Sequence, residues 1–115
     1  MAFGELESKR IEKSLAGYVE RIRPPAHLRS KVDVSFRIAG QSVEIFEIRP
    51  RWDNAKEILE HPVAKATYVK ARNAWKVFWR RADLAWHLYP PTPQVSTIDA
   101  FVALVEQDAH HCFWD

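Results

Sequence analysis

The sequence predicts an α+β fold, in which one antiparallel sheet of about five strands is flanked by an N-terminal and a C-terminal helix. Helical periodicity marks two segments near the ends of the chain, and apolar and polar residues alternate with the period of a strand between them. Residues 68–89 contain three of the five Trp residues and have the pattern of a β-meander. Because packed aromatic side chains remove much apolar area from water, we expect the other elements to be organised around this meander.

Length and composition predict one globular domain over residues 1–115. Hydrophobic residues make up 47% of the chain and charged residues 28%. The single Cys excludes an intramolecular disulfide, and we expect neither a signal peptide nor a membrane helix, because no apolar run is long enough. A cytoplasmic protein with no membrane partner is expected. The net charge of +2 does not indicate nucleic acid by itself, so any basic footprint depends on where the charges lie.

An amphipathic helix is predicted over residues 3–22. Apolar residues recur there at helical spacing, with charges of both signs on the other side. The pair Pro24-Pro25 ends this helix, because proline cannot donate a backbone hydrogen bond and restricts the residue before it. The apolar stripe consists of Ile11, Leu15, Tyr18 and Ile22.

Two strands and a connection are predicted next. The first strand spans residues 32–38, where apolar and polar residues alternate. The second spans residues 42–49 and is expected to stop at Pro50, because a proline removes a ladder hydrogen bond. Residues 54–62 are expected to be a connection, with a short helical turn at residues 55–59.

The meander is predicted to begin with a strand at residues 65–71. Arg72-Asn73-Ala74 supplies the following turn, since Asn tolerates a left-handed conformation better than most residues. Further strands are expected at residues 75–80 and 86–89.

A C-terminal helix is predicted after the proline-rich run at residues 90–93. Ser96 or Thr97 can cap it. The tail at residues 110–114 ends in two aromatic residues, which we expect to be held against the core. The apolar stripe of the helix consists of Ile98, Phe101, Val102 and Val105.

Several short motifs, spread over nearly the whole chain, carry a resemblance to a known family. They are Arg23-Pro24-Pro25, Gly40-Gln41-Ser42-Val43, Phe46-Glu47-Ile48-Arg49-Pro50, Trp75, Val77-Phe78-Trp79-Arg80, Trp86-His87-Leu88-Tyr89 and Cys112-Phe113-Trp114. With these motifs the chain resembles the bacterial domain-of-unknown-function family 3024. The resemblance implies a small helix-flanked sheet domain and carries no established activity.

Basic and aromatic residues are interleaved along the meander, beside the rings of Tyr68, Trp75 and Phe78. Guanidinium groups can meet phosphates while rings stack on bases, so this pattern predicts a non-catalytic module that binds nucleic acid. The candidate binding residues are Lys70, Arg72, Lys76, Arg80, Arg81, Trp86 and His87. The hypothesis requires Arg72, Lys76, Arg80 and Arg81 to share one exposed face. The competing interpretation is structural, with the aromatic residues in the core and Arg80 paired with Asp83 or Glu47.

Two acids and a lysine form a second constellation. Glu44 and Glu47 stand near the end of a strand, and Lys65 falls on a later segment. Metal-dependent nucleases use acids to hold Mg²⁺ and a lysine to steady developing charge. The competing interpretation is an ion pair of Glu47 with Arg49 or Arg51.

The tail contains residue types that bind transition metals. No paired ligand motif precedes them, so a zinc site would need distant His residues to converge. A thiolate pair of Cys112 with His87 lacks a visible orienting acid and an oxyanion loop. We therefore expect no metal, no cofactor and no catalytic residue. The tail residues in question are Glu106, Asp108, His110, His111 and Cys112.

Two alternatives to nucleic-acid binding remain from the sequence. One is a protein-interaction or regulatory domain that acts as a homodimer or with another protein, through an exposed aromatic patch. The other is a small metal-dependent nuclease built on Glu44, Glu47 and Lys65.

Overall fold

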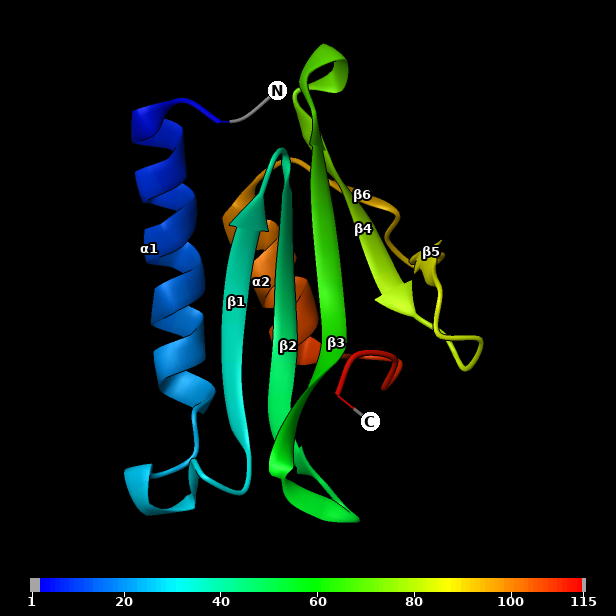
Figure 1. Cartoon of the computed structure of the whole chain (residues 1–115). Helices are drawn as coiled ribbons and strands as arrows, with labels where there is room; N and C mark the ends of the chain where they lie inside the picture. The colour runs from blue at the N-terminus through cyan, green and yellow to red at the C-terminus, as the bar shows by residue number, and fades with distance from the viewer. Residues whose placement is uncertain (1–2, 115) are drawn as a thin grey trace.

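The computed structural model describes residues 3–114 of the chain, which fold into two helices and a sheet (Figure 1). Two single-turn 3₁₀ helices, Ala26–Leu28 and Lys70–Arg72, lie in the connections. The main elements are α1 (Glu5–Ile22), β1 (Asp33–Ala39), β2 (Ser42–Arg51), β3 (Asn54–Val69), β4 (Ala74–Arg80), β5 (Trp86–Leu88), β6 (Gln94–Val95) and α2 (Ile98–Gln107).

The strands form one antiparallel sheet. Strands β1 to β5 follow one another across it in sequence order, and the short strand β6 pairs with β4 beside β5. This arrangement confirms the predicted α+β fold with a helix near each end of the chain. The sheet has six strands, whereas about five were predicted. The additional strand, β6, has only two residues, and a segment this short has no recognisable alternating pattern in the sequence.

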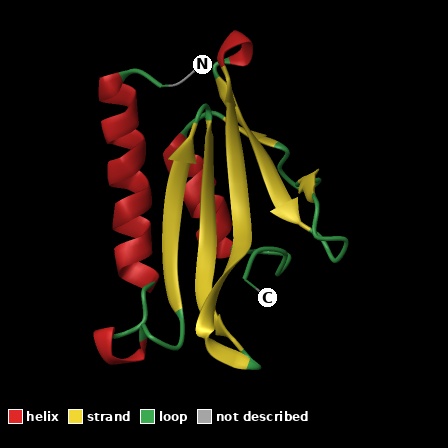
Figure 2. Cartoon of the chain, in the orientation of Figure 1, coloured by secondary structure: helices red, strands yellow, loops and turns green. Residues whose placement is uncertain are grey.

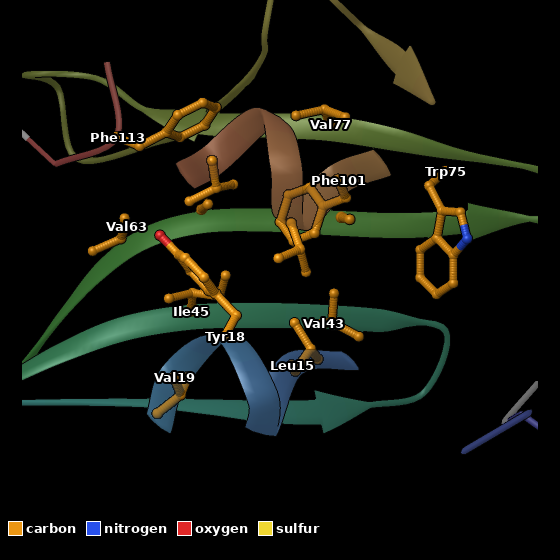
Figure 3. Packing of buried hydrophobic residues seen from close by; sticks show 14 of the residues in the cluster. Leu15, Tyr18, Val19, Val43, Ile45, Val63, Trp75, Val77, Phe101 and Phe113 are labelled. Atoms are coloured by element: carbon orange, nitrogen blue, oxygen red, sulfur yellow. The ribbon is translucent and has the colours of Figure 1, made fainter. Parts of the chain in front are cut away.

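Both helices cover the same face of the sheet. Figure 1 shows α2 behind the sheet and α1 alongside β1. Leu15 and Tyr18 of α1 and Phe101 of α2 pack together with residues of the strands, and Figure 3 shows them converging in one cluster. Burial of these apolar side chains is the main force that holds the layers together. The strand residues at the centre of this cluster are Val43, Ile45, Ala64, Ala66 and Val77.

The structure corrects the prediction for residues 54–62. They form neither a connection nor a helical turn, but the first half of β3, which pairs with the end of β2 (Figure 2). Nor does β2 stop at Pro50; it continues to Arg51. The pairing of β1 with β2 begins at Ile48, so the end of β2 has a neighbouring strand on one side only. A proline is tolerated at such an edge.

Three local predictions are confirmed. Asn73 adopts the left-handed conformation, with φ of 49°, where β3 turns into β4. Thr97 caps α2, because its hydroxyl accepts a hydrogen bond of 3.0 Å from the backbone N–H of Ala100. Phe113 is only 6% exposed and packs against Tyr89, with 4.8 Å between the ring centroids, so the tail is held against the core.

Neither α1 nor α2 has the length and apolar character needed to cross a membrane, and no other helix among residues 3–114 does.

Candidate functional site on the outer face of the sheet

We call the sheet face opposite the helices the outer face, and strand register determines which of its side chains are neighbours. Cross-strand partners point to the same side of a sheet, so the pairing defines rows of neighbouring side chains. One row crosses five strands and consists of Arg37, Glu44, Lys65, Phe78 and Leu88. The next row consists of Ala39, Ser42, Thr67, Lys76 and Gln94. Within residues 3–114 both helices pack on the opposite face, against residues such as Val43, Ala64 and Val77.

Cations and rings meet on the part of the outer face formed by β3, β4 and β5. The ammonium Nζ of Lys65 lies 5.8 Å from the ring centroid of Phe78 and 5.8 Å from that of Trp86. Trp86 is the cross-strand partner of Arg80, and Lys76 lies two residues before Phe78 on the same side of β4. We call these five residues the outer-face cluster.

None of the three cations of this cluster forms an ion pair within residues 3–114, although Glu44 is the cross-strand neighbour of Lys65. The ion pairs of that part of the chain include neither Lys65, Lys76 nor Arg80. In addition, the Nε atom of Arg80 is buried and has no hydrogen-bond partner there. The charges of Lys65, Lys76 and Arg80 are therefore not neutralised by an ion pair within this part of the chain, although the Nε atom of Arg80 is itself inaccessible.

The other half of the outer face is neutralised. Arg37 is paired with Glu44 at 3.8 Å and also with Glu60, and its guanidinium lies 4.3 Å from the ring centroid of Phe46. The charge of Arg37 and the ring of Phe46 are thus both occupied. Arg37 therefore differs from Lys65, Lys76 and Arg80, which form no ion pair within residues 3–114.

The structure brings together some of the residues predicted from the sequence. Lys76, Arg80 and Trp86 all belong to the outer-face cluster. Lys70 and Arg72 instead lie in the 3₁₀ turn between β3 and β4, where Arg72 reaches Gln94 at 3.5 Å.

Arg81 and His87 are directed away from the cluster. The guanidinium of Arg81 lies 5.6 Å from the ring centroid of Trp79, which belongs to the helix-covered face. His87 pairs with Trp79 across the strands and so shares that face. Its Nε2 lies 2.8 Å from the carboxylate of Asp83. Arg72, Lys76, Arg80 and Arg81 do not share one face, so the binding surface predicted from these four residues does not form. Of the four, only Lys76 and Arg80 belong to the outer-face cluster, and Lys65 of β3 joins them there.

The structural interpretation is correct for two of the aromatic residues. Trp75 is 5% exposed and belongs to the core, and the partly buried Tyr68 packs against it with 5.2 Å between their ring centroids. It is not correct for Arg80, which pairs with neither Asp83 nor Glu47. The pKa of the Asp83 carboxyl is lowered first by the backbone N–H of Ala85 and then by its hydrogen bond with the His87 ring.

Lys65 is the member of the cluster that sequence reasoning did not assign to this surface. Its position depends on a β-bulge in β3, where Val63 is inserted between the partners of Ile45 and Phe46. A bulge changes which residues of a strand face outward, and the local alternation of apolar and polar residues in the sequence does not indicate where a bulge occurs. Lys76, Phe78 and Arg80 alternate along β4 with the core residues Trp75 and Val77 and therefore share one side.

The residues of the hypothetical metal-dependent nuclease do not converge. Glu44 and Lys65 are direct cross-strand partners on the outer face. Glu47, however, is the partner of Val34 on the helix-covered face, where it pairs with Arg49 at 3.0 Å. The predicted Glu47–Arg49 ion pair is thus confirmed, and the acids that would share a metal lie on opposite sides of the sheet.

The Asp108 carboxylate holds the backbone of the C-terminal tail in place. The Asp108 carboxylate accepts hydrogen bonds from the backbone N–H groups of Phe113 at 3.0 Å and Trp114 at 3.1 Å. Burial raises the pKa of the Cys112 thiol, so this group is not poised as a thiolate. Across residues 3–114 no three His, Cys, Asp or Glu side chains are grouped as a metal site.

These features define an α+β protein with helices on one face of an antiparallel sheet and a partly basic, aromatic outer face. The chain belongs to the family DUF3024, described as a domain of unknown function, whose family model matches residues 3–115. No curated protein and no solved structure matches the chain.

Proposed function

We propose that the protein is a non-catalytic module that binds single-stranded nucleic acid through the outer-face cluster. The observation that carries the proposal is the position of Lys65, Lys76 and Arg80, which form no ion pair within residues 3–114, beside the rings of Phe78 and Trp86. The cations supply contacts to phosphate and the rings supply stacking surfaces.

Single strands suit this surface better than duplexes. A ring that stands on a sheet can stack on a base only when that base has left its own helical stack. The Lys65 ammonium lies close to both rings and must move aside for a base to stack there. A long, flexible lysine side chain can make this movement and then contact a phosphate.

The binding is expected to be weak and sensitive to salt. Each phosphate neutralised on a single strand contributes a slope of about −0.7 to the dependence of log affinity on log salt concentration, so three contacts predict a slope of about −2. The proposed location is the cytoplasm of a bacterium, since a chain with one cysteine suits a reducing compartment and nucleic acids are present there.

The proposal is tested by intrinsic Trp fluorescence during titration with single-stranded and double-stranded oligonucleotides of the same sequence. Saturable quenching by the single strand, weaker for the duplex and reduced by salt, is expected. The triple variant Lys65→Met, Lys76→Met, Arg80→Met should lose this quenching.

A matched control carries Lys13→Met, Lys31→Met and Lys56→Met. These three lysines are exposed and lie away from the cluster. Their replacement removes as many positive charges as the first triple variant does, so the net charge changes from +2 to −1 in both variants. Equal losses in the two triple variants would show that net charge, and not the cluster, governs binding.

One observation favours a homodimer as a second candidate function. Trp52, at the tip of the hairpin between β2 and β3, is 94% exposed, and Ile58 on the same hairpin is also exposed. Exposed apolar groups of this kind often mark interfaces. Light scattering of the purified protein and of the variant Trp52→Ser, Ile58→Ser tests this alternative. A dimeric mass that becomes monomeric in the variant would support it.

A further inference from the structure

A pocket lies on the helix side of the sheet, on the face opposite the outer-face cluster. It has a volume of about 450 Å³ and is formed where the end of α1, the start of β1, strand β2, the helix α2 and the C-terminal tail meet. Pockets that hold small ligands typically enclose about 300–1,000 Å³. Its lining includes Tyr18, Ile22, Val34, Glu47, Glu106 and Trp114.

The apolar part of the lining is built around two rings. The Trp114 indole donates a hydrogen bond of 3.0 Å to the hydroxyl of Tyr18, so the tail and α1 together form one wall. Burial is the main cause that raises the pKa of Tyr18, and the phenol therefore stays neutral at physiological pH. The faces of aromatic rings carry partial negative charge and attract cations.

The charged residues that line the pocket include more carboxylates than cations. Glu47 and Glu106 contribute two carboxylates from different elements, whereas Arg49 is the one cation among the lining residues. The Arg49 guanidinium already donates a hydrogen bond of 3.0 Å to Glu47. Glu106 is left as the carboxylate with the weaker internal partner.

A neighbouring side chain demonstrates that this wall attracts positive charge. The guanidinium of Arg21, which lies outside the pocket lining, is 5.5 Å from the ring centroid of Tyr18 and 3.5 Å from a Glu106 carboxylate oxygen. Arg21 is largely exposed, so its ion pair is weak and easily displaced.

We propose that this pocket binds a small organic amine with an apolar body. The body lies against Ile22, Val34 and the Trp114 ring, and the ammonium group pairs with the Glu106 carboxylate in place of Arg21. A carboxylate ligand of the same shape would meet Glu47 and Glu106 with like charge and is excluded. This site is independent of the proposed nucleic-acid surface, because it lies on the other face of the sheet.

The proposal is tested with two probes that share one body, phenethylamine and phenylpropionate. Amide chemical shifts of the full chain are followed by NMR during titration with each probe. Saturable shifts that cluster at the pocket residues are expected for the amine, with no saturation for the carboxylate. Equal binding of the two probes, or amine shifts scattered over the surface, would overturn the proposal.

Two conservative variants separate recognition from folding. Glu106→Gln keeps the shape of the side chain and should weaken amine binding about twofold to fivefold. Arg21→Gln removes the competing cation and should tighten it. The matched control Glu12→Gln removes an exposed carboxylate of α1 outside the pocket and should leave binding unchanged. If Glu106→Gln and Glu12→Gln behave alike, Glu106 does not hold the amine and the proposal fails.

Discussion

The indole Nε1 of Trp114 donates a hydrogen bond to the hydroxyl of Tyr18 over a distance of 3.0 Å. Tyr18 is 1% exposed in the middle of the core, whereas Trp114 stands near the end of the chain. The bond therefore joins the first helix to the tail across nearly the whole sequence. Together with the buried ring of Phe113, it makes the tail part of the packed structure.

Replacing Trp114 by Phe should lower the free energy of unfolding by about 1 kcal/mol. The variant keeps an aromatic ring but leaves the buried Tyr18 hydroxyl without this donor, and a typical hydrogen bond contributes about that much. Urea unfolding measures the change. Trp52→Phe, at a fully exposed position, serves as the control and should shift stability by less than about 0.5 kcal/mol. Equal effects in the two variants would contradict a structural role of the bond.

The ion pair of Asp33 with Arg23 should make the free energy of unfolding depend on pH in the acid range. The Arg23 guanidinium donates two hydrogen bonds to its carboxylate, at 2.9 and 2.8 Å, and this contact is the main cause that lowers the pKa of Asp33. The unfolded chain then binds the proton more readily than the folded one. The stabilisation is fully present above the unfolded carboxyl pKa of about 3.9 and is lost as the pH falls through the lower folded value.

The variant Asp33→Asn tests this pH dependence. Its urea midpoint should lie below that of the parent protein at neutral pH, and the difference should shrink as the pH is lowered below about 4. Glu12→Gln, which changes an exposed carboxyl of α1, provides the comparison. A difference for Asp33→Asn that stays constant down to the lowest pH would show that the ion pair does not cause it.

Thr97→Ala should cost about 1 kcal/mol of stability. The Thr97 hydroxyl accepts the hydrogen bond from the Ala100 N–H at the start of α2, and loss of such a cap typically has this effect. Ser96→Ala changes the preceding hydroxyl residue, which is exposed, and should have almost no effect. Thermal unfolding followed by circular dichroism distinguishes the two. The conservative change Thr97→Ser should restore most of the stability.

The salt dependence of nucleic-acid binding should separate the residues that the structure brings together from those it does not. Lys65→Met with Lys76→Met should reduce the slope of log affinity against log salt concentration by about 1.4 in magnitude, since each contact contributes about 0.7. Lys13→Met with Arg81→Met, which removes the same charge from the helix side of the sheet, should leave the slope nearly unchanged. The reverse result would mean that cations on the helix side form the binding surface.

Periodicity in the sequence predicted the elements whose pattern is local. The helix α1 and the helix α2 carry apolar stripes, and β1 and β4 alternate between two faces. The left-handed turn at Asn73 and the cap at Thr97 were also predictable, because each depends on the chemistry of one residue and its immediate neighbours.

The first half of β3 could not be predicted in this way. Residues 54–62 include several charged residues and a proline, which do not predict a strand. They form one because their backbone pairs with the end of β2. Strand β6 arises similarly, since its two residues pair with β4. In both places hydrogen bonding to a distant segment decided the conformation.

The sequence by itself determined the fold class, the ends of most elements and the presence of basic and aromatic residues in the meander. Only the tertiary structure decided which of those residues meet. Strand register and the bulge at Val63 place Lys65 beside Phe78 and Trp86, whereas Arg81 and His87 fall on the other side of the sheet. The physical reason is that a shift of one residue in pairing moves a side chain to the opposite face, and pairing is set by contacts between segments far apart in the chain.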